Sequence, residues 1–77
     1  MTLASLSPGA RGRVRRVEGQ AELQRRLAEL GILPGARVEL VRVAPLGDPL
    51  EVRVRGTLLT LRRREAACIE IEPEVAA

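Results

Sequence analysis

Few residues in this sequence have side chains that could do chemistry. Histidine is absent, Cys68 is the single cysteine and Asp48 is the single aspartate. Asp48 precedes Pro49, a pattern typical of a turn residue that bonds its own backbone. A general acid–base pair needs a carboxylate in a desolvating environment, and no pattern in the chain builds one. The sequence therefore predicts a protein that is not an enzyme.

A cofactor or metal site is not expected either. Iron and zinc sites draw on clustered His, Cys and carboxylate ligands, which one cysteine without histidine cannot supply. Glu70, Glu72 and Glu74 lie on the solvated face of a predicted strand or in the tail. We expect Cys68 to be a small, half-buried filler, with a reactive or dimer-linking thiol as the alternative. The seven glycines are scattered, without a phosphate-binding motif.

Positive charge is concentrated in the run Arg62-Arg63-Arg64. All 13 basic residues are arginine, and the acidic residues after this run give the chain an acidic end. An arginine run binds phosphates or an acidic protein surface, or it is simply a solvated turn. Because the chain has no Phe, Tyr or Trp, it lacks the stacking platforms that single-stranded nucleic acid requires. Binding of nucleic acid is therefore disfavoured, although contact with its phosphates is not excluded.

Alternating apolar residues predict five short strands that could hold such side chains in place. The expected strands cover residues 12–17, 37–43, 50–55, 57–61 and 68–72, with a bulge near Leu40–Val41 and a tight hairpin at Arg55-Gly56. A short helical turn is expected over residues 62–67. The inward residues are predicted to be Val14, Val38, Leu40, Val52, Val54, Leu59, Leu61, Ile69 and Ile71.

One helix is predicted over residues 18–30. Leu23, Leu27 and Leu30 form a single stripe at i, i+4 and i+7, and this stripe should cap the strands. Glu22 and Arg26 are spaced as an i,i+4 ion pair. Gly31 then stands where a left-handed residue ends a helix, so Ile32 can fold back onto Leu27.

These elements predict a mainly β protein, a small closed barrel or sandwich of about five strands with one short capping helix. The expected organisation is a loose leader over residues 1–5, one domain over 6–72 and a short acidic tail over 73–77. No run of about 20 apolar residues is present, so no membrane insertion is expected. The absence of a secretory signal pattern makes a cytoplasmic location the simplest expectation.

Three leucines fall outside the inward registers and are candidates for a binding surface. Leu33 follows the helix, Leu46 lies in a Pro-Gly-Asp loop, and Leu58 is out of phase with Leu59 and Leu61. We predict that Leu33, Leu46 and Leu58 form the apolar centre of a partner-binding surface. The arginines Arg62, Arg63 and Arg64 would be its charged rim. The alternatives are that Leu46 and Leu58 tuck under their own loops, or that the surface makes a homo-oligomer.

The chain resembles the FeoA family of ferrous-iron-transport accessory proteins over roughly residues 6–72. The resemblance is carried by Leu30-Gly-Ile with Pro34-Gly35, by residues 44–56 (APLGDPLEVRVRG), and by residues 61–62 and 66–69. It implies an SH3-like barrel and a cytosolic accessory or regulatory role, by protein–protein interaction with FeoB, the GTP-dependent membrane transporter of ferrous iron. FeoA proteins have no defining catalytic or metal-binding motif, so the resemblance implies no site residues. The alternative function is a stand-alone basic barrel that binds RNA or phosphate surfaces.

Overall fold

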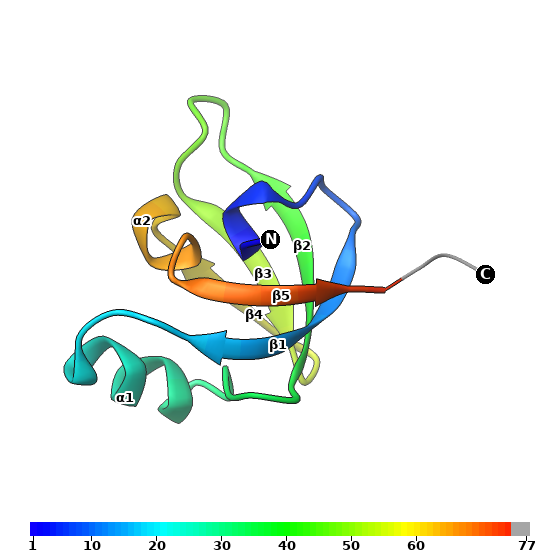
Figure 1. The fold of residues 1–77 in the computed structure, drawn as a ribbon. Helices are drawn as coiled ribbons and strands as arrows, with labels where there is room; N and C mark the ends of the chain where they lie inside the picture. Colours follow the sequence, from blue (N-terminus) through cyan, green and yellow to red (C-terminus); the bar gives the residue numbers. More distant parts are fainter. Residues whose placement is uncertain (75–77) are drawn as a thin grey trace.

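A computed structural model of the protein describes residues 1–74, which build one antiparallel sheet with short helices at its margins (Figure 1). The five strands lie in the order β4-β3-β2-β1-β5. This mainly β architecture was predicted from the alternating apolar residues. In chain order the elements are η1 (Leu3–Ser5), β1 (Arg11–Val17), α1 (Ala21–Glu29), β2 (Arg37–Val43), β3 (Leu50–Val54), β4 (Thr57–Leu61), α2 (Arg63–Ala66) and β5 (Ile69–Pro73).

Two irregularities bend the sheet around its core. The pairing of β2 with β3 shifts register between Leu40 and Arg42, where the sequence predicts a bulge. The pairing of β1 with β5 shifts between Val14 and Arg16. An extra residue on one strand increases the local twist and bend, so residues on both sides of the shift can serve one core. The predicted hairpin also forms, with positive φ angles of 53° at Arg55 and 78° at Gly56.

The inner face of the bent sheet holds the core. Eight of the nine predicted inward residues are buried, and the exception is Leu59, which is half-buried because β4 lies at the edge of the sheet. Apolar burial of this kind is the main stabilising contribution in a small domain. The core consists of Leu3, Leu6, Val14, Leu27, Ile32, Val38, Leu40, Leu50, Val52, Val54, Leu61, Ala66, Ile69 and Ile71.

Helix α1 is shorter than predicted and ends as predicted. The N–H of Ile32 donates to the carbonyl of Leu27 at 2.9 Å, and Gly31 has a φ of 95°, which is the Schellman arrangement. Leu27 is fully buried and Leu23 packs against the core from its margin. Leu30 is 43% exposed, so its predicted place in the capping stripe was wrong. It is the last residue before the left-handed turn, and its side chain faces solvent.

An ion pair joins α1 to the rest of the molecule. Arg26 pairs with Glu65 of α2 rather than with Glu22, the partner that the i,i+4 spacing predicted. Glu65 also accepts a hydrogen bond from the backbone N–H of Arg62 at 2.9 Å. Because Glu65 is already held by this second bond, an ion pair with it loses less side-chain entropy than an ion pair with a freely moving Glu22 would.

The N-terminal segment is not the loose leader predicted for residues 1–5. Leu3 is fully buried, and the carbonyl of Met1 accepts a hydrogen bond from the N–H of Ile71 at 2.7 Å. Thr2 forms an isolated bridge with Glu70. The first residues therefore lie along β5 and contribute to the core. Their partners are about 70 positions away in the sequence, so local patterning gave no sign of them.

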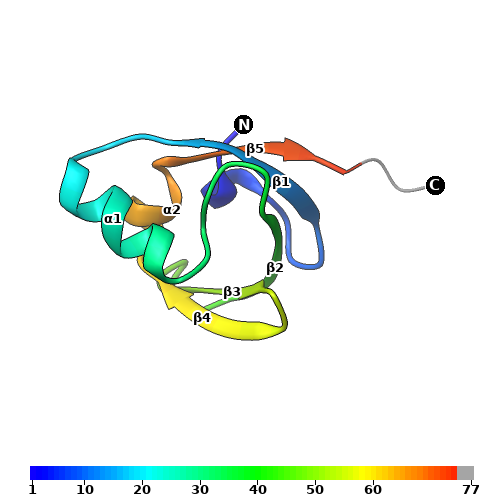
Figure 2. The same ribbon diagram turned by 90° about the horizontal axis from the view of Figure 1, so that it is seen from below.

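The barrel is open on one side, contrary to the expectation of a closed barrel. Within residues 1–74, no strand pairing joins β4 to β5, and α2 carries the chain between them. Figure 2 shows β4 and β5 on opposite sides of the molecule. At the other end of β5, Pro73 belongs to the strand and Glu74 pairs with Arg37 at 2.8 Å. The rest of the predicted tail, residues 75–77, lies outside the described residues.

Candidate partner-binding surface

The loop between β2 and β3 presents the most exposed leucine of the described chain. Residues 44–49 are held by two bonds across the loop, from Ala44 N–H to the Pro49 carbonyl at 3.0 Å and from Gly47 N–H to the Ala44 carbonyl at 2.7 Å. Leu46, at the tip, is 97% exposed. It therefore does not tuck under its own loop, and its side chain makes no contribution to the core.

Arg63 fixes this loop to the body of the protein. Its Nε donates to the carbonyl of Gly47 at 2.6 Å, and its Nη1 donates to the carbonyl of Ala4 at 3.0 Å. The backbone N–H of Arg63 donates to Asp48 Oδ1 at 3.0 Å. One side chain thus joins the 44–49 loop, η1 and α2, and it is half-buried in doing so. The middle arginine of the run is a structural residue.

The two neighbours of Arg63 behave differently. Arg62 and Arg64 are exposed, and neither guanidinium has a carboxylate partner within residues 1–74. Arg62 precedes α2, and of the three arginines only Arg63 bonds the carbonyls of Gly47 and Ala4, so a run of identical residues has two roles. Only its first and third members remain available as cations at the surface.

The structure places the three candidate leucines in three different locations. The pairing of Leu50 with Leu61 puts the 44–49 loop at one end of β3, whereas Leu58 pairs with Arg53 beside the hairpin at the other end. The ends of a five-residue strand are roughly 14 Å apart. Leu58 is 51% exposed on β4. The predicted surface is therefore not one continuous patch, and of its members only the Arg62–Arg64 run lies next to the Leu46 loop.

Leu33 borders a separate groove. It is 41% exposed and lies with Pro34 and Ile32 along a groove of about 440 Å³ between α1 and β1. Val17, Ala21 and Ala28 complete its apolar wall. This groove was not predicted, because it forms only where the helix packs beside the strand.

Cys68 lies in a cleft of about 530 Å³ between α1 and α2, together with Leu23 and Arg64. The thiol is half-buried, as predicted, and is 3.5 Å from the carbonyl of Arg64, to which its S–H can donate. Within residues 1–74, no three His, Cys, Asp or Glu side chains converge where they could hold a metal ion. The described part of the cleft therefore brings no set of metal ligands to the thiol.

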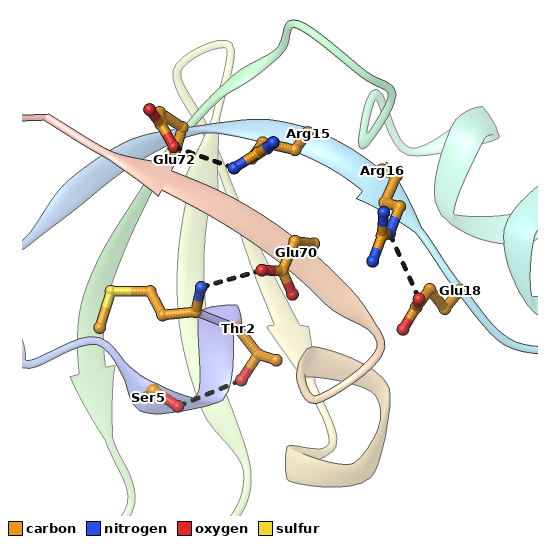
Figure 3. A network of polar contacts seen from close by, with 8 residues as sticks. Thr2, Ser5, Arg15, Arg16, Glu18, Glu70 and Glu72 are labelled. Atoms are coloured by element: carbon orange, nitrogen blue, oxygen red, sulfur yellow. Dashed lines mark hydrogen bonds and ion pairs between the residues drawn. The ribbon is translucent and has the colours of Figure 1, made fainter.

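A network of ion pairs covers β5 and the adjoining part of β1 (Figure 3). Arg15 pairs with Glu72, Arg16 pairs with Glu18, and the N-terminal ammonium pairs with Glu70 at 2.9 Å. The hydrogen bond from this ammonium is the main reason that the pKa of Glu70 is lowered, while partial burial acts in the opposite direction. The nearby positive charges of the ammonium, Arg16 and Arg15 lower it further. This side of the molecule is therefore largely neutralised by its own pairs.

A small, bent sheet of five antiparallel strands with short helices at its margins is a fold of the SH3-like class. Comparison with known proteins agrees with this class. The FeoA domain model matches residues 1–73, so the chain belongs to the FeoA domain family. This family consists of non-enzymatic accessory domains associated with ferrous iron transport.

Individual relatives extend the comparison. The chain is 38% identical over 72 residues to a fusion of Fe(2+) transport protein A with the Fe(2+) transporter FeoB from Porphyromonas gingivalis, covering 94% of this chain and 8% of that protein. The FeoA protein of Chlorobium tepidum is 43% identical with a TM-score of 0.92, over 97% of this chain and 71% of that one. The FeoA of Stenotrophomonas maltophilia is described as a procaryotic SH3 domain protein and is complexed with zinc. It is 34% identical with a TM-score of 0.81, over 94% of this chain and 89% of that one. The SH3-like fold implied by the sequence resemblance is thereby confirmed.

Proposed function

We propose that this protein is a cytoplasmic accessory protein of ferrous iron uptake that acts by binding a FeoB-type membrane transporter. The observation that supports this most strongly is the fusion of a similar domain to FeoB in one chain. Fusion keeps two domains at a high effective concentration, which benefits a pair that must meet in order to act. This chain spans 8% of that relative.

The described surface fits such a role better than a transport or catalytic role. None of the described helices is long and apolar enough to cross a membrane. Leu46, next to two arginines that have no carboxylate partner within residues 1–74, provides the apolar and charged elements of a protein interface. The proposed contact residues are therefore Leu46 with Arg62 and Arg64 next to its loop, and Leu58 and Leu33 are separate candidates. Arg63 acts by holding the Leu46 loop in place.

Binding to the transporter tests this proposal. The full-length FeoB-type transporter of the same organism would be placed in nanodiscs and titrated with the 77-residue protein, with empty nanodiscs as the control. Saturable binding to the transporter alone is expected. Binding to neither, or equal binding to both, would refute the proposal. The basic-barrel alternative predicts instead that the protein binds RNA. Because phosphate contacts would carry that binding, its affinity should fall steeply between roughly 50 and 200 mM salt.

Single substitutions would assign the surface. Leu46 and Leu58 lie at opposite ends of β3. The affinity for the transporter should therefore be measured for Leu46→Ser, Leu58→Ser and Leu33→Ser as three single variants. Each residue is exposed, so each variant should keep the wild-type unfolding transition. A variant that weakens binding at least tenfold, or about 1.4 kcal/mol, identifies its residue as part of the interface. If all three variants bind as the wild type does, the proposed surface is wrong.

A further inference from the structure

The two edge strands of the sheet differ in how they are protected. At β5 the N-terminal segment pairs with the free edge, through the bond from Ile71 N–H to the Met1 carbonyl and the bridge between Thr2 and Glu70. Figure 3 shows this segment beside the strand. The strand also carries two glutamates and ends in Pro73. Charged residues, proline and a covering segment are the usual means of preventing an edge from pairing with another chain.

The edge at β4 has none of these protections. Its single neighbour in the sheet is β3. Within residues 1–74, no element other than β3 makes a backbone hydrogen bond to residues 57–61. Its sequence, Thr-Leu-Leu-Thr-Leu, is free of charge and of proline. Each of the other four strands carries two or more charged residues. An uncharged, largely apolar edge strand with unpaired backbone groups is a ready template for another strand.

The register shows which groups this edge offers. The two-residue hairpin makes Val54 and Thr57 the first hydrogen-bonded pair, so the alternation of an antiparallel ladder turns Leu58 and Thr60 away from β3. Their N–H and C=O groups therefore point to the open edge. Leu58 and Thr60 are exposed, and Leu59 is half-buried on the inner face. An added strand would have an apolar neighbour on each of its two faces.

The charges at the ends of β4 indicate what can bind there. Arg55 lies in the turn before the strand, and Arg62 and Arg64 follow it, all without carboxylate partners within residues 1–74. A second copy that paired β4 with β4 in antiparallel fashion would bring the Arg55 end of each molecule against the Arg62–Arg64 end of the other. Like charges at both ends oppose that arrangement. An apolar strand with carboxylates at its ends meets opposite charges instead.

We propose that β4 binds an extended apolar segment of the partner, with acidic residues at both of its ends, by β-strand addition. Backbone hydrogen bonds to Leu58 and Thr60 supply affinity, as in other strand-addition complexes, and the flanking arginines select the acidic segment. This inference rests on the proposed function, because it takes the FeoB-type transporter as the protein that provides the segment.

A proline substitution tests the backbone bonds. Thr60→Pro removes one outward N–H and leaves the bonds between β3 and β4 in place, because proline is tolerated where the N–H faces away from the sheet. Thr60→Ala is the matched control, since it removes the hydroxyl and keeps the N–H. We expect Thr60→Pro to bind the nanodisc-held transporter at least tenfold more weakly than the wild type, and Thr60→Ala to bind within twofold of it. Equal binding of the proline and alanine variants, both folded by circular dichroism, would overturn strand addition.

Hydrogen exchange gives the same test on the wild-type protein and decides the matter if Thr60→Pro does not fold. In the complex, amide exchange over residues 57–61 should slow by tenfold or more, while exchange over 69–73, on the protected edge, should stay unchanged. Unchanged exchange over 57–61 in a saturated complex would overturn the inference and leave the proposed function intact. Failure of the wild-type protein to bind the transporter would overturn both.

A charge variant tests the nature of the segment. Arg55→Asn combined with Arg62→Gln removes one cation at each end of β4, and asparagine tolerates the positive φ at position 55. Binding should weaken at least tenfold at low salt, and its salt dependence should decrease. The matched control is Arg42→Gln, which removes a cation that is already paired with Glu51. If the double variant and the control bind equally, the bound segment is not acidic.

Discussion

Arg63 is the one member of the arginine run whose loss should damage the fold. Its guanidinium donates to the carbonyls of Gly47 and Ala4, and no other side chain of the described chain bonds either group. A hydrogen bond from a charged donor contributes about 1.5–3 kcal/mol. Because Arg63 is half-buried rather than buried, we take the lower part of that range for each bond. For two bonds, Arg63→Ala should therefore destabilise the protein by about 3–4 kcal/mol.

Urea denaturation is the appropriate assay for this loss. The chain has no aromatic residue, so unfolding must be followed by far-UV circular dichroism rather than by fluorescence. With an m-value of about 1 kcal/mol/M, typical of a small domain, the midpoint should fall by about 3–4 M. A total stability of about 4–11 kcal/mol is usual for this size, so the variant would lose a large part of it.

Two further variants separate bonding from charge. Arg64→Ala removes the same charge without a bond to either carbonyl and should change stability by less than about 0.5 kcal/mol. Arg63→Lys keeps the charge but cannot donate to both carbonyls in the fixed planar arrangement of arginine, so it should fall between the other two. If Arg63→Ala and Arg64→Ala unfold at the same urea concentration, the structural role assigned to Arg63 is wrong.

Three further predictions concern the core, the close approach of β1 and β5 at Gly12, and the dependence of stability on pH. Leu27→Ala should cost about 2–5 kcal/mol of unfolding free energy because Leu27 is fully buried, whereas Leu30→Ala should cost less than about 1 kcal/mol, as measured by urea melts. Gly12→Ala should cost about 1–3 kcal/mol, because the added Cβ would lie 2.7 Å from the Glu72 carbonyl oxygen. Glu70 has a lowered pKa in the folded chain, so its stabilising contribution is present above the unfolded pKa and is lost as the pH falls through the folded pKa. Melting temperatures between about pH 3 and 6 should accordingly depend less on pH in Glu70→Gln.

Each of these predictions has a result that would contradict it. Equal losses in Leu27→Ala and Leu30→Ala would mean that α1 does not cap the core through Leu27. An unchanged midpoint in Gly12→Ala would mean that β1 and β5 do not approach as closely as described. A Glu70→Gln variant with the wild-type pH profile would mean that the ammonium–carboxylate bond does not persist in solution.

The sequence predicted the parts of the fold that depend on local pattern. Strict alternation over residues 50–54 identified a strand with one buried face, and this is how Val52 and Val54 lie. Gly31 after a leucine stripe predicted the end of α1, and the bond from Ile32 to Leu27 confirms it. In each case a short stretch of chain determines the geometry, so the amino-acid spacing alone was sufficient.

The parts that were missed depend on distant partners. Leu3 is buried because the first residues pair with β5, and nothing within the first five residues indicates that pairing. The apolar spacing of Leu3 and Leu6 was the one available signal. Arg63 differs from its two neighbours only because carbonyls of Gly47 and Ala4 lie near it in space. Sequence patterns cannot distinguish among three adjacent arginines.

The candidate site was predicted in its components but not in its arrangement. Leu46 and Leu58 are exposed, as their positions out of register predicted. Their separation follows from the pairing of Leu50 with Leu61, which the sequence does not state. The absence of charge from residues 57–61 is visible in the sequence. Its meaning depends on the strand order, which places these residues at an open edge.

The central claim is that this protein acts on a FeoB-type transporter by binding to it. The most direct measurement is ferrous iron flux across the membrane of vesicles that contain the purified transporter. The 77-residue protein is either left out or added on the face of the membrane that carries the transporter's soluble domain. We predict that the protein changes the flux saturably, and that Thr60→Pro loses this effect while Thr60→Ala retains it. A flux that stays the same at every protein concentration, with the transporter active, would contradict the account.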